Sequence, residues 1–280
     1  MKACEQFRAD KNHKLDEASA AAKPLGAVTK AANKDLSNGE SKAIDRASTT
    51  ALTGQIAECQ NMLYAQRKQK LLLVLQGMDT AGKDGTVKAI FSAINPMGVR
   101  AVAFKAPTDI ELAHDYLWRV HQQVPVRGEI AIFNRSHYED VLITRVQGMI
   151  DKKECERRYA QIRDFERMLS ETGTVIVKIF LHISKEEQRA RLQERLDDPN
   201  RQWKFDPNDL TQRLSWDEYQ RAYETAIAET DAGHAPWYVV PANSKVQRNL
   251  IVASLLLETM QGLKLSYPSS DARLAAIKVV

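Results

Sequence analysis

An eight-residue segment, Gly77–Asp84, has the residue types and spacing of a phosphate-binding loop. Its sequence, GMDTAGKD, fits the pattern G-x-x-x-x-G-K. Gly77 and Gly82 allow a tight turn whose N–H groups can point at phosphate oxygens, and Lys83 adds a mobile positive charge. A chance glycine turn beside a solvated lysine is the alternative, but an apolar run precedes the segment and a helical pattern follows it. We therefore assign phosphate binding to the loop and the turn after it, namely Gly77, Met78, Thr80, Ala81, Gly82, Asp84, Gly85 and Thr86.

The loop lacks the hydroxyl that usually binds Mg²⁺ in such motifs. Asp84 occupies the position of the usual Ser or Thr, and Thr86 comes two residues later. If the loop serves a metal-dependent transfer of a phosphoryl group, the metal needs another oxygen ligand. Asp79 inside the loop can supply a carboxylate. Asp79 is therefore predicted to bind metal or phosphate, the alternative being that it caps the turn. The expected metal is Mg²⁺, with Mn²⁺ as a possible substitute.

A second polar cluster, NRSHYED, follows the apolar run EIAIF and spans Asn134–Asp140. Kinases with such a phosphate loop place a metal-binding acid where a strand ends at the carboxyl edge of a parallel sheet. Glu139 and Asp140 are predicted to bind metal, and Arg135 is predicted to neutralise charge on the transferred group. The alternative is that Arg135 and Asp140 only cap the following helix.

A parallel sheet is needed to position both clusters, and the chain has the pattern of one. Short continuous apolar runs indicate strands that are buried on both faces, and segments with helical periodicity separate them. The expected strands are Leu71–Gly77, Val99–Phe104, Glu129–Phe133, Thr174–Ile183 and Trp237–Pro241, and helical segments include Asp84–Ile94, Asp109–His121 and Lys152–Glu171. This alternation predicts a three-layer α/β/α fold with a parallel central sheet.

Two segments fall outside this alternation. Residues 1–40 are rich in Ala, Lys, Asn and Ser, and we expect an irregular or loosely packed arm, followed by an amphipathic helix from Ser41 to about Lys70. Residues 184–230 are highly charged and mostly helical in pattern, with breaks around Pro199 and Pro207, which suits a lid over the site. The predicted organisation is an arm, 1–40, and one kinase domain, 41–280, with a lid insertion at about 184–230.

The composition is that of an ordinary globular protein. The chain has 280 residues, of which 44% are hydrophobic and 27% charged, enough for a substantial core. The formal net charge of +4 is too mild to indicate nucleic-acid binding, although clustered basic residues can still bind a polyanion. Cys4, Cys59 and Cys155 lack metal-ligand spacing and are expected to be free thiols. No segment resembles a spanning helix or a signal peptide, so we expect a cytoplasmic location, with no membrane or nucleic-acid partner.

Seven motifs, taken in order, resemble those of the family-2 polyphosphate kinases: GMDTAGKDGT, FKAPT, LWRVH, FNRSHYEDVL, FLHISKEEQ, WKF and APWYVVPA. The resemblance covers roughly residues 60–265 and implies a P-loop kinase fold, phosphoryl transfer from inorganic polyphosphate to a nucleotide, and a homo-oligomer, either a dimer or a tetramer. The site strand ending Asn-Arg-Ser-His-Tyr-Glu resembles the subclass that phosphorylates both AMP and ADP, reversibly, to ADP and ATP. A strand ending Asp-Arg-Ser-Trp-Tyr-Asn is typical of enzymes that act on nucleoside diphosphates.

Carried over residue by residue, the resemblance implies four catalytic residues: Asp79, Lys83, Arg135 and Arg195. Asn134 stands where the diphosphate subclass has an acidic residue, so metal binding must depend on Asp79, Glu139 or Asp140. Phosphoryl transfer needs no protein nucleophile, because the acceptor oxygen itself attacks. Asn134 and Glu139 are also assigned to substrate binding.

A polyphosphate donor also needs a track of basic side chains. The candidates near strand ends or the lid are Lys88, Lys105, Arg119, Arg191, Arg201 and Lys204, and for each the alternative is a solvated surface charge. Aromatic residues that could stack on adenine are Trp203, Trp216, Tyr219 and Tyr223, although the last three form a helical stripe that is typical of packing.

Two other functions remain open. An ATP-dependent nucleoside monophosphate kinase on the same fold would have the same loop and lid, and only the extended set of motifs disfavours it. A catalytically silent binder of nucleotide or polyphosphate would be expected to lack Lys83 or the acidic residues, which are all present.

Overall fold

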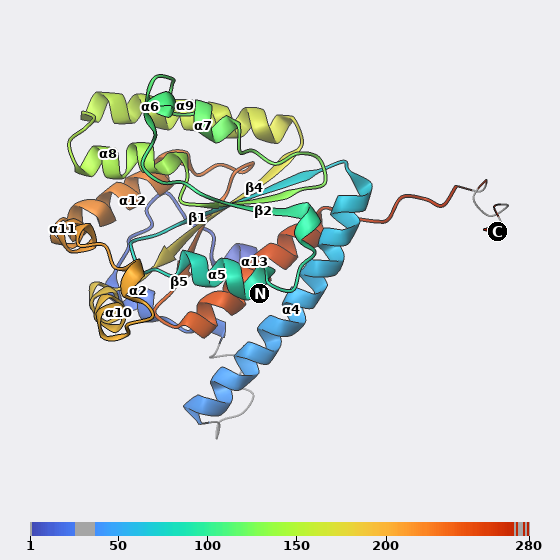
Figure 1. Ribbon diagram of the computed structural model, residues 1–280, viewed down its shortest axis with the longest axis horizontal. Helices are drawn as coiled ribbons and strands as arrows, with labels where there is room; N and C mark the ends of the chain where they lie inside the picture. Colours follow the sequence, from blue (N-terminus) through green and yellow to red (C-terminus); the bar gives the residue numbers. More distant parts are fainter. Residues whose placement is uncertain (1, 26–36, 272, 274–276, 278, 280) are drawn as a thin grey trace.

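Five parallel strands form the central sheet, in the order β2-β3-β1-β4-β5 (Figure 1). The computed structural model describes residues 2–25, 37–271, 273, 277 and 279. The strands are β1 (Lys70–Gln76), β2 (Val99–Ala103), β3 (Ile130–Asn134), β4 (Thr174–His182) and β5 (Trp237–Pro241). Each coincides with a predicted apolar run. In β1, six consecutive residues, from Leu71 to Gln76, are fully buried, because helices cover both faces of the sheet.

Two layers of helices enclose the sheet (Figure 1). One face is covered by α4 (Asn38–Gln66), α5 (Lys83–Phe91) and α13 (Lys245–Gly262), and the other by α8 (Ile143–Val146), α9 (Lys152–Glu171) and α12 (Trp216–Thr230). The predicted three-layer α/β/α architecture is confirmed. None of the described helices is long and apolar enough to cross a membrane.

The N-terminal segment contacts the core more closely than expected. It contains two short helices, α1 (Ala3–Gln6) and α2 (Glu17–Ala21). Between them, the backbone N of Ala9 donates to the carbonyl of Trp237, and the N of Val239 donates to the carbonyl of Phe7. The prediction of a loosely packed arm is therefore wrong for residues 2–25, because this segment pairs with the edge strand β5 and buries Phe7. Residues 26–36 of the predicted arm lie outside the described residues.

The predicted helix Asp109–His121 is divided in two, α6 (Asp109–Leu112) and α7 (Trp118–His121). The carboxylate of Asp115 accepts a hydrogen bond from the backbone N of Leu117, at 3.0 Å. Such local bonds offer the backbone an alternative to the helical pattern. The prediction of one continuous helix is wrong for this reason.

Residues 185–230 are helical and interrupted at the predicted places. They form α10 (Lys185–Asp197), the 3₁₀ turn η3 (Gln202–Lys204), α11 (Asn208–Leu214) and α12. The breaks coincide with Pro199 and Pro207. Helix α12 packs against α8 and α9 and buries Trp216, Tyr219 and Tyr223, which confirms the interpretation of these aromatics as a packing stripe. Two further 3₁₀ turns, η1 (Pro96–Gly98) and η2 (His137–Val141), precede β2 and follow β3.

A buried polar network supports the turn that follows β3. The ammonium of Lys178, in the middle of β4, lies 2.6 Å from a carboxylate oxygen of Glu166 and 2.8 Å from the carbonyl of Thr230. The other oxygen of Glu166 accepts from the Tyr138 hydroxyl, at 2.8 Å, and lies 3.2 Å from Nε2 of His137. Since His137 and Tyr138 belong to η2, this network positions the backbone that carries the neighbouring site residues.

Candidate active site

A cavity of about 1820 Å³ lies at the carboxyl edge of the sheet, where loops after β1, β2 and β3 meet α10, α11 and α13. Thirteen of the predicted site residues line it: Asp79, Thr80, Gly82, Lys83, Asp84, Gly85, Lys105, Asn134, Arg135, Glu139, Asp140, Arg195 and Lys204. Pockets for one small ligand typically occupy about 300–1,000 Å³. The cavity therefore has room for two substrates side by side.

The glycine-rich loop turns sharply between β1 and α5. Gly82 has φ of +99°, a left-handed conformation that glycine adopts without strain. Lys83 folds back over the loop, and its ammonium donates to the carbonyls of Gly77, at 2.7 Å, and Met78, at 3.4 Å. Burial and the nearby charge of Arg135 lower the pKa of Lys83 to about 8. A phosphate group beside this ammonium would favour its charged form and raise the pKa again.

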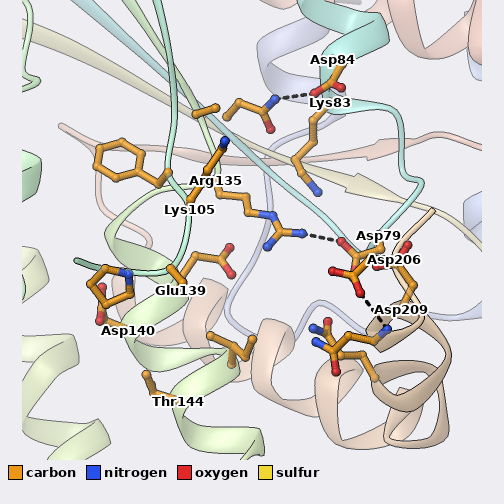
Figure 2. Close-up of a pocket in the computed structure, with 18 of the residues that line it drawn as sticks. Asp79, Lys83, Asp84, Lys105, Arg135, Glu139, Asp140, Thr144, Asp206 and Asp209 are labelled. Carbon is orange, nitrogen blue, oxygen red and sulfur yellow. Dashed lines mark hydrogen bonds and ion pairs between the residues drawn. The ribbon is translucent and has the colours of Figure 1, made fainter. Parts of the chain in front are cut away.

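Arg135 lies between two carboxylates (Figure 2). Its guanidinium is 2.5 Å from a carboxylate oxygen of Asp79, and Glu139 lies on its other side (Figure 2). Burial lowers the pKa of Arg135, but the charges of Glu139 and Asp79 more than offset this, so the pKa stands above its ordinary value. Arg135 adopts a left-handed backbone conformation, with φ of +62°. Such strain in a non-glycine residue is typical of functional sites.

Asn134 and Asp84 form a matched pair at the ends of β3 and the loop. The amide nitrogen of Asn134 donates to one carboxylate oxygen of Asp84, at 2.6 Å, and Lys204 lies 3.5 Å from the other oxygen. Partial burial raises the pKa of Asp84, but the Asn134 hydrogen bond and the charge of Lys204 lower it by more. The pKa of this carboxyl therefore lies below its ordinary value. The amide donor is what allows a carboxylate at position 84, because an acid at position 134 would repel it.

Asp140 faces arginines instead of the loop. Its carboxylate lies 3.9 Å from Arg119 and 4.0 Å from Arg158. Burial raises the pKa of Asp140 to about 6, although both arginines oppose this shift. The structure therefore separates Asp140 from Asp79, while Arg135 stands between Asp79 and Glu139.

Two further carboxylates of the cavity wall are Asp206, between η3 and α11, and Asp209, in the first turn of α11. Asp209 lies near Asp79 (Figure 2), and burial together with the charge of Asp79 raises the pKa of Asp209 to about 6. Within the described residues, no group of three or more His, Cys, Asp or Glu is placed to hold a metal ion by itself. Mg²⁺ usually takes one or two carboxylates and completes its shell with water and substrate phosphates. Asp79, with Asp209 nearby, fits that requirement.

Comparison with known proteins identifies the family. Residues 39–267 match the profile of a family described as Polyphosphate kinase 2 (PPK2). The chain belongs to this family. It is 54% identical, over 82% of its length and 85% of the relative's, to an AMP/ADP-polyphosphate phosphotransferase of Meiothermus ruber. It is 44% identical, over 77% of its length and 79% of the relative's, to an ADP-polyphosphate phosphotransferase of Rhodopseudomonas palustris.

A crystal structure of polyphosphate kinase 2 from Arthrobacter aurescens TC1 superimposes on this chain with a TM-score of 0.88. The two proteins are 44% identical, and the match covers 99% of this chain and 95% of the other. Membership of the PPK2 family confirms both the resemblance seen in the motifs and the predicted P-loop kinase fold.

Several predicted residues of this PPK2 protein lie outside the cavity wall. Gly77, Met78, Ala81 and Thr86 do not line the cavity, and the hydroxyl of Thr86 donates to the carbonyl of Gly82, at 3.0 Å. Lys88 is exposed on α5 and does not line the cavity. The other candidates for the basic track do line it: Lys105, Arg119, Arg191, Arg201 and Lys204. Trp203 is 77% exposed and is absent from the wall.

Arg195 reaches the site from α10. Its guanidinium donates to the carbonyl of Lys204, at 3.1 Å, and lies 3.4 Å from a carboxylate oxygen of Asp209. These contacts connect α10 to η3 and to α11.

Sequence reasoning missed several charged residues of the wall, among them Asp206, Asp209 and Arg248. The two acids gave no signal, because only the fold brings them to the cavity. Arg248 could have been found from the sequence, because it falls in the first turn of a helix that begins just after a strand. A cation there opposes the helix dipole and needs another reason for its presence.

Proposed function

We propose that this protein transfers the terminal phosphoryl group of inorganic polyphosphate to AMP and to ADP, giving ADP and ATP, and that the reaction is reversible. The main observation behind this proposal is a cavity, large enough for two substrates, in which Arg135 contacts Asp79 of the phosphate loop. The printed names of PPK2 relatives, which include AMP/ADP- and ADP-polyphosphate phosphotransferases, support this reaction. They disfavour an ATP-dependent nucleoside monophosphate kinase.

The two ends of the cavity differ in chemistry. Near β2 and α8 its wall includes apolar side chains, among them Phe104, Ile143 and Ile150, which suit a nucleoside. Near α5, α10 and α13 the wall is rich in cations: Lys83, Arg191, Arg195, Arg201, Lys204, Lys245 and Arg248. An inorganic chain of phosphates has no apolar part, so the second end suits the donor and the first suits the acceptor.

The chain's own residues position and stabilise the transferred group. Lys83 and Arg135 place positive charge where the loose transition state of phosphoryl transfer carries negative charge. Arg195 adds a third cation from α10. The acceptor phosphate oxygen is the nucleophile, so no residue needs to form a covalent intermediate.

Asp79 is the residue that would hold Mg²⁺, together with phosphate oxygens of the substrates, while Asp209, Glu139 and Asp140 are further carboxylates of the wall. Mg²⁺ would supply charge neutralisation to phosphate oxygens when bound. Mn²⁺ is the expected substitute. We further propose a cytoplasmic homo-oligomer, a dimer or tetramer, that does not act on nucleic acid.

The test incubates the purified protein with Mg²⁺, polyphosphate and either AMP or ADP, and separates the nucleotides by chromatography. We expect ADP and then ATP from AMP, and ATP from ADP. Turnover of ADP alone would overturn the proposed use of AMP. Nucleotide phosphorylation only when ATP is the donor would overturn the proposed donor.

A further inference from the structure

Arg248 is a buried cation without a carboxylate partner among the described residues. It lies in the first turn of α13 and is 3% exposed, yet it lines the cavity. Its guanidinium donates to neutral acceptors, the carbonyl of Ala81, at 3.2 Å, and the side-chain oxygen of Asn249, at 2.8 and 3.1 Å. A buried charge is costly unless it is paired, so this arrangement calls for an anion.

The neighbouring Arg191 is also buried beside the loop, but it has a carboxylate partner. It pairs with Glu187 at 2.7 Å and donates to the carbonyls of Thr80, Ala81, Ala242 and Asn243. Arg248 has no such carboxylate in the described part of the chain. Burial, followed by the charge of Arg191, lowers the pKa of Arg248 to about 10. The positive charge of Arg191 therefore repels that of Arg248, and a nearby anion would relieve this repulsion.

The guanidinium of Arg248 occupies the space beside the two glycines at the start of α5. A Cβ atom built on Gly82 would fall on Nη1 of Arg248, and one built on Gly85 would lie 3.4 Å from Nη2. The first turn of α5 is also where free backbone N–H groups and the helix dipole favour an anion. The helix terminus and the unpaired arginine are separate observations that indicate the same kind of ligand.

We propose that Arg248 is a polyphosphate-binding residue, which takes its counter-charge from a phosphate group of the donor lying across Gly82 and Gly85. This inference rests on the proposed function, since it needs polyphosphate to be a substrate.

The position of Arg248 favours the donor over the nucleotide. It follows β5, at one edge of the sheet, whereas the apolar part of the wall around Phe104 follows β2, at the opposite edge. The cationic residues near Arg248 come from the same side of the cavity, and include Lys245 in the same helical turn. A phosphate chain that extends from Lys83 toward α13 passes Arg248 and moves away from the nucleoside.

The test measures thermal unfolding with and without sodium tripolyphosphate, at constant ionic strength, for wild type, Arg248→Met and Arg248→Lys. We expect tripolyphosphate to raise the Tm of wild type, to have little effect on Arg248→Met, and to have an intermediate effect on Arg248→Lys. Without ligand, Arg248→Met should be as stable as wild type or more so, because a desolvated charge is removed. The carbonyl of Ala81 still accepts from Arg191.

Steady-state kinetics provide the second readout. Loss of a hydrogen-bonded charge should raise the KM for polyphosphate about 10- to 100-fold in Arg248→Met, with the KM for AMP unchanged. The control is Arg167→Met, which removes an exposed arginine of α9 that pairs with Asp164 and Glu171. It should match wild type in both experiments.

Three results would overturn the inference. An equal response of Arg248→Met and wild type to tripolyphosphate would show that the guanidinium does not contact the donor. A lower Tm without ligand, with equal losses toward tripolyphosphate and AMP, would show a purely structural role. If wild type itself ignores tripolyphosphate while binding AMP, the proposed donor is wrong and the inference fails with it.

Discussion

The hydrogen bond between Asn134 and Asp84 makes a quantitative prediction. Replacing Asn134 by Asp puts two carboxylates where the structure has a 2.6 Å hydrogen bond. Two unit charges about 4 Å apart repel by about 1 kcal/mol in water and by about 4 kcal/mol near a protein surface. Loss of a charge-assisted hydrogen bond costs a further 1.5–3 kcal/mol or so. Because the side chain of Asp84 is 68% exposed, solvent screens much of the repulsion. We expect Asn134→Asp to lower the free energy of unfolding by about 2 kcal/mol.

The double variant Asp84→Asn/Asn134→Asp should recover most of this loss, because the exchanged pair can form the same bond in reverse. Urea unfolding at pH 7 of the wild type, both single variants and the double variant gives the coupling energy, which we expect to be about 2 kcal/mol. The deficit of Asn134→Asp should also shrink as the pH falls toward 4, where one carboxyl of the pair becomes protonated.

A matched control is Asn61→Asp, the same chemical change at an exposed position of α4, for which we expect a change below about 0.5 kcal/mol. Equal stability of Asn134→Asp and that control, or simple additivity of the two single variants in the double variant, would show that the Asn134–Asp84 bond does not contribute to stability.

Three further predictions concern the loop and its support. Because burial lowers the pKa of Lys83 to about 8, its positive charge is lost as the pH rises through that value in the free enzyme. The kcat/KM for polyphosphate should therefore fall about tenfold per pH unit above 8, and a flat profile to pH 10 would contradict this. Glu166→Gln leaves the buried ammonium of Lys178 without its ion-pair partner, and should cost about 3–5 kcal/mol in chemical unfolding; a cost below about 1 kcal/mol would show that the pair is dispensable. Gly82→Ala forces a side chain into a left-handed conformation and onto the guanidinium of Arg248. It should lower the free energy of unfolding by about 1–3 kcal/mol and weaken binding of tripolyphosphate, measured by calorimetry.

The strands and the loop are predictable because local sequence determines them. The apolar runs of β1, β3, β4 and β5 are buried as predicted, whereas the run of β2 contains Arg100 and is only partly buried, because it forms an edge of the sheet. The runs of β1 and β3 end in glycine and asparagine at the carboxyl edge. The carboxyl ends of parallel strands meet at one edge of a sheet, so the sequence alone assigns Lys83 and Arg135 to one site, although they are about 50 residues apart in the chain.

The remaining features depend on tertiary contacts that no local pattern reports. The N-terminal segment is ordered by pairing with β5, which lies more than 200 residues away in the chain. Asp209 reaches Asp79 only because η3 and α11 fold over the cavity. Lys178 sits inside an apolar run, and only the positions of Glu166 and Thr230 explain how a charge is accommodated there.

The pairing of Phe7–Ala9 with β5 has a consequence for how the protein behaves at high concentration. An uncovered edge strand offers a row of free N–H and C=O groups to any other extended chain, and such edges are a common start of aggregation. Here the bonds to Trp237 and Val239 already occupy part of that row. The N-terminal segment thus blocks part of this edge against pairing with other chains, and it does so away from the active site at the carboxyl edge of the sheet.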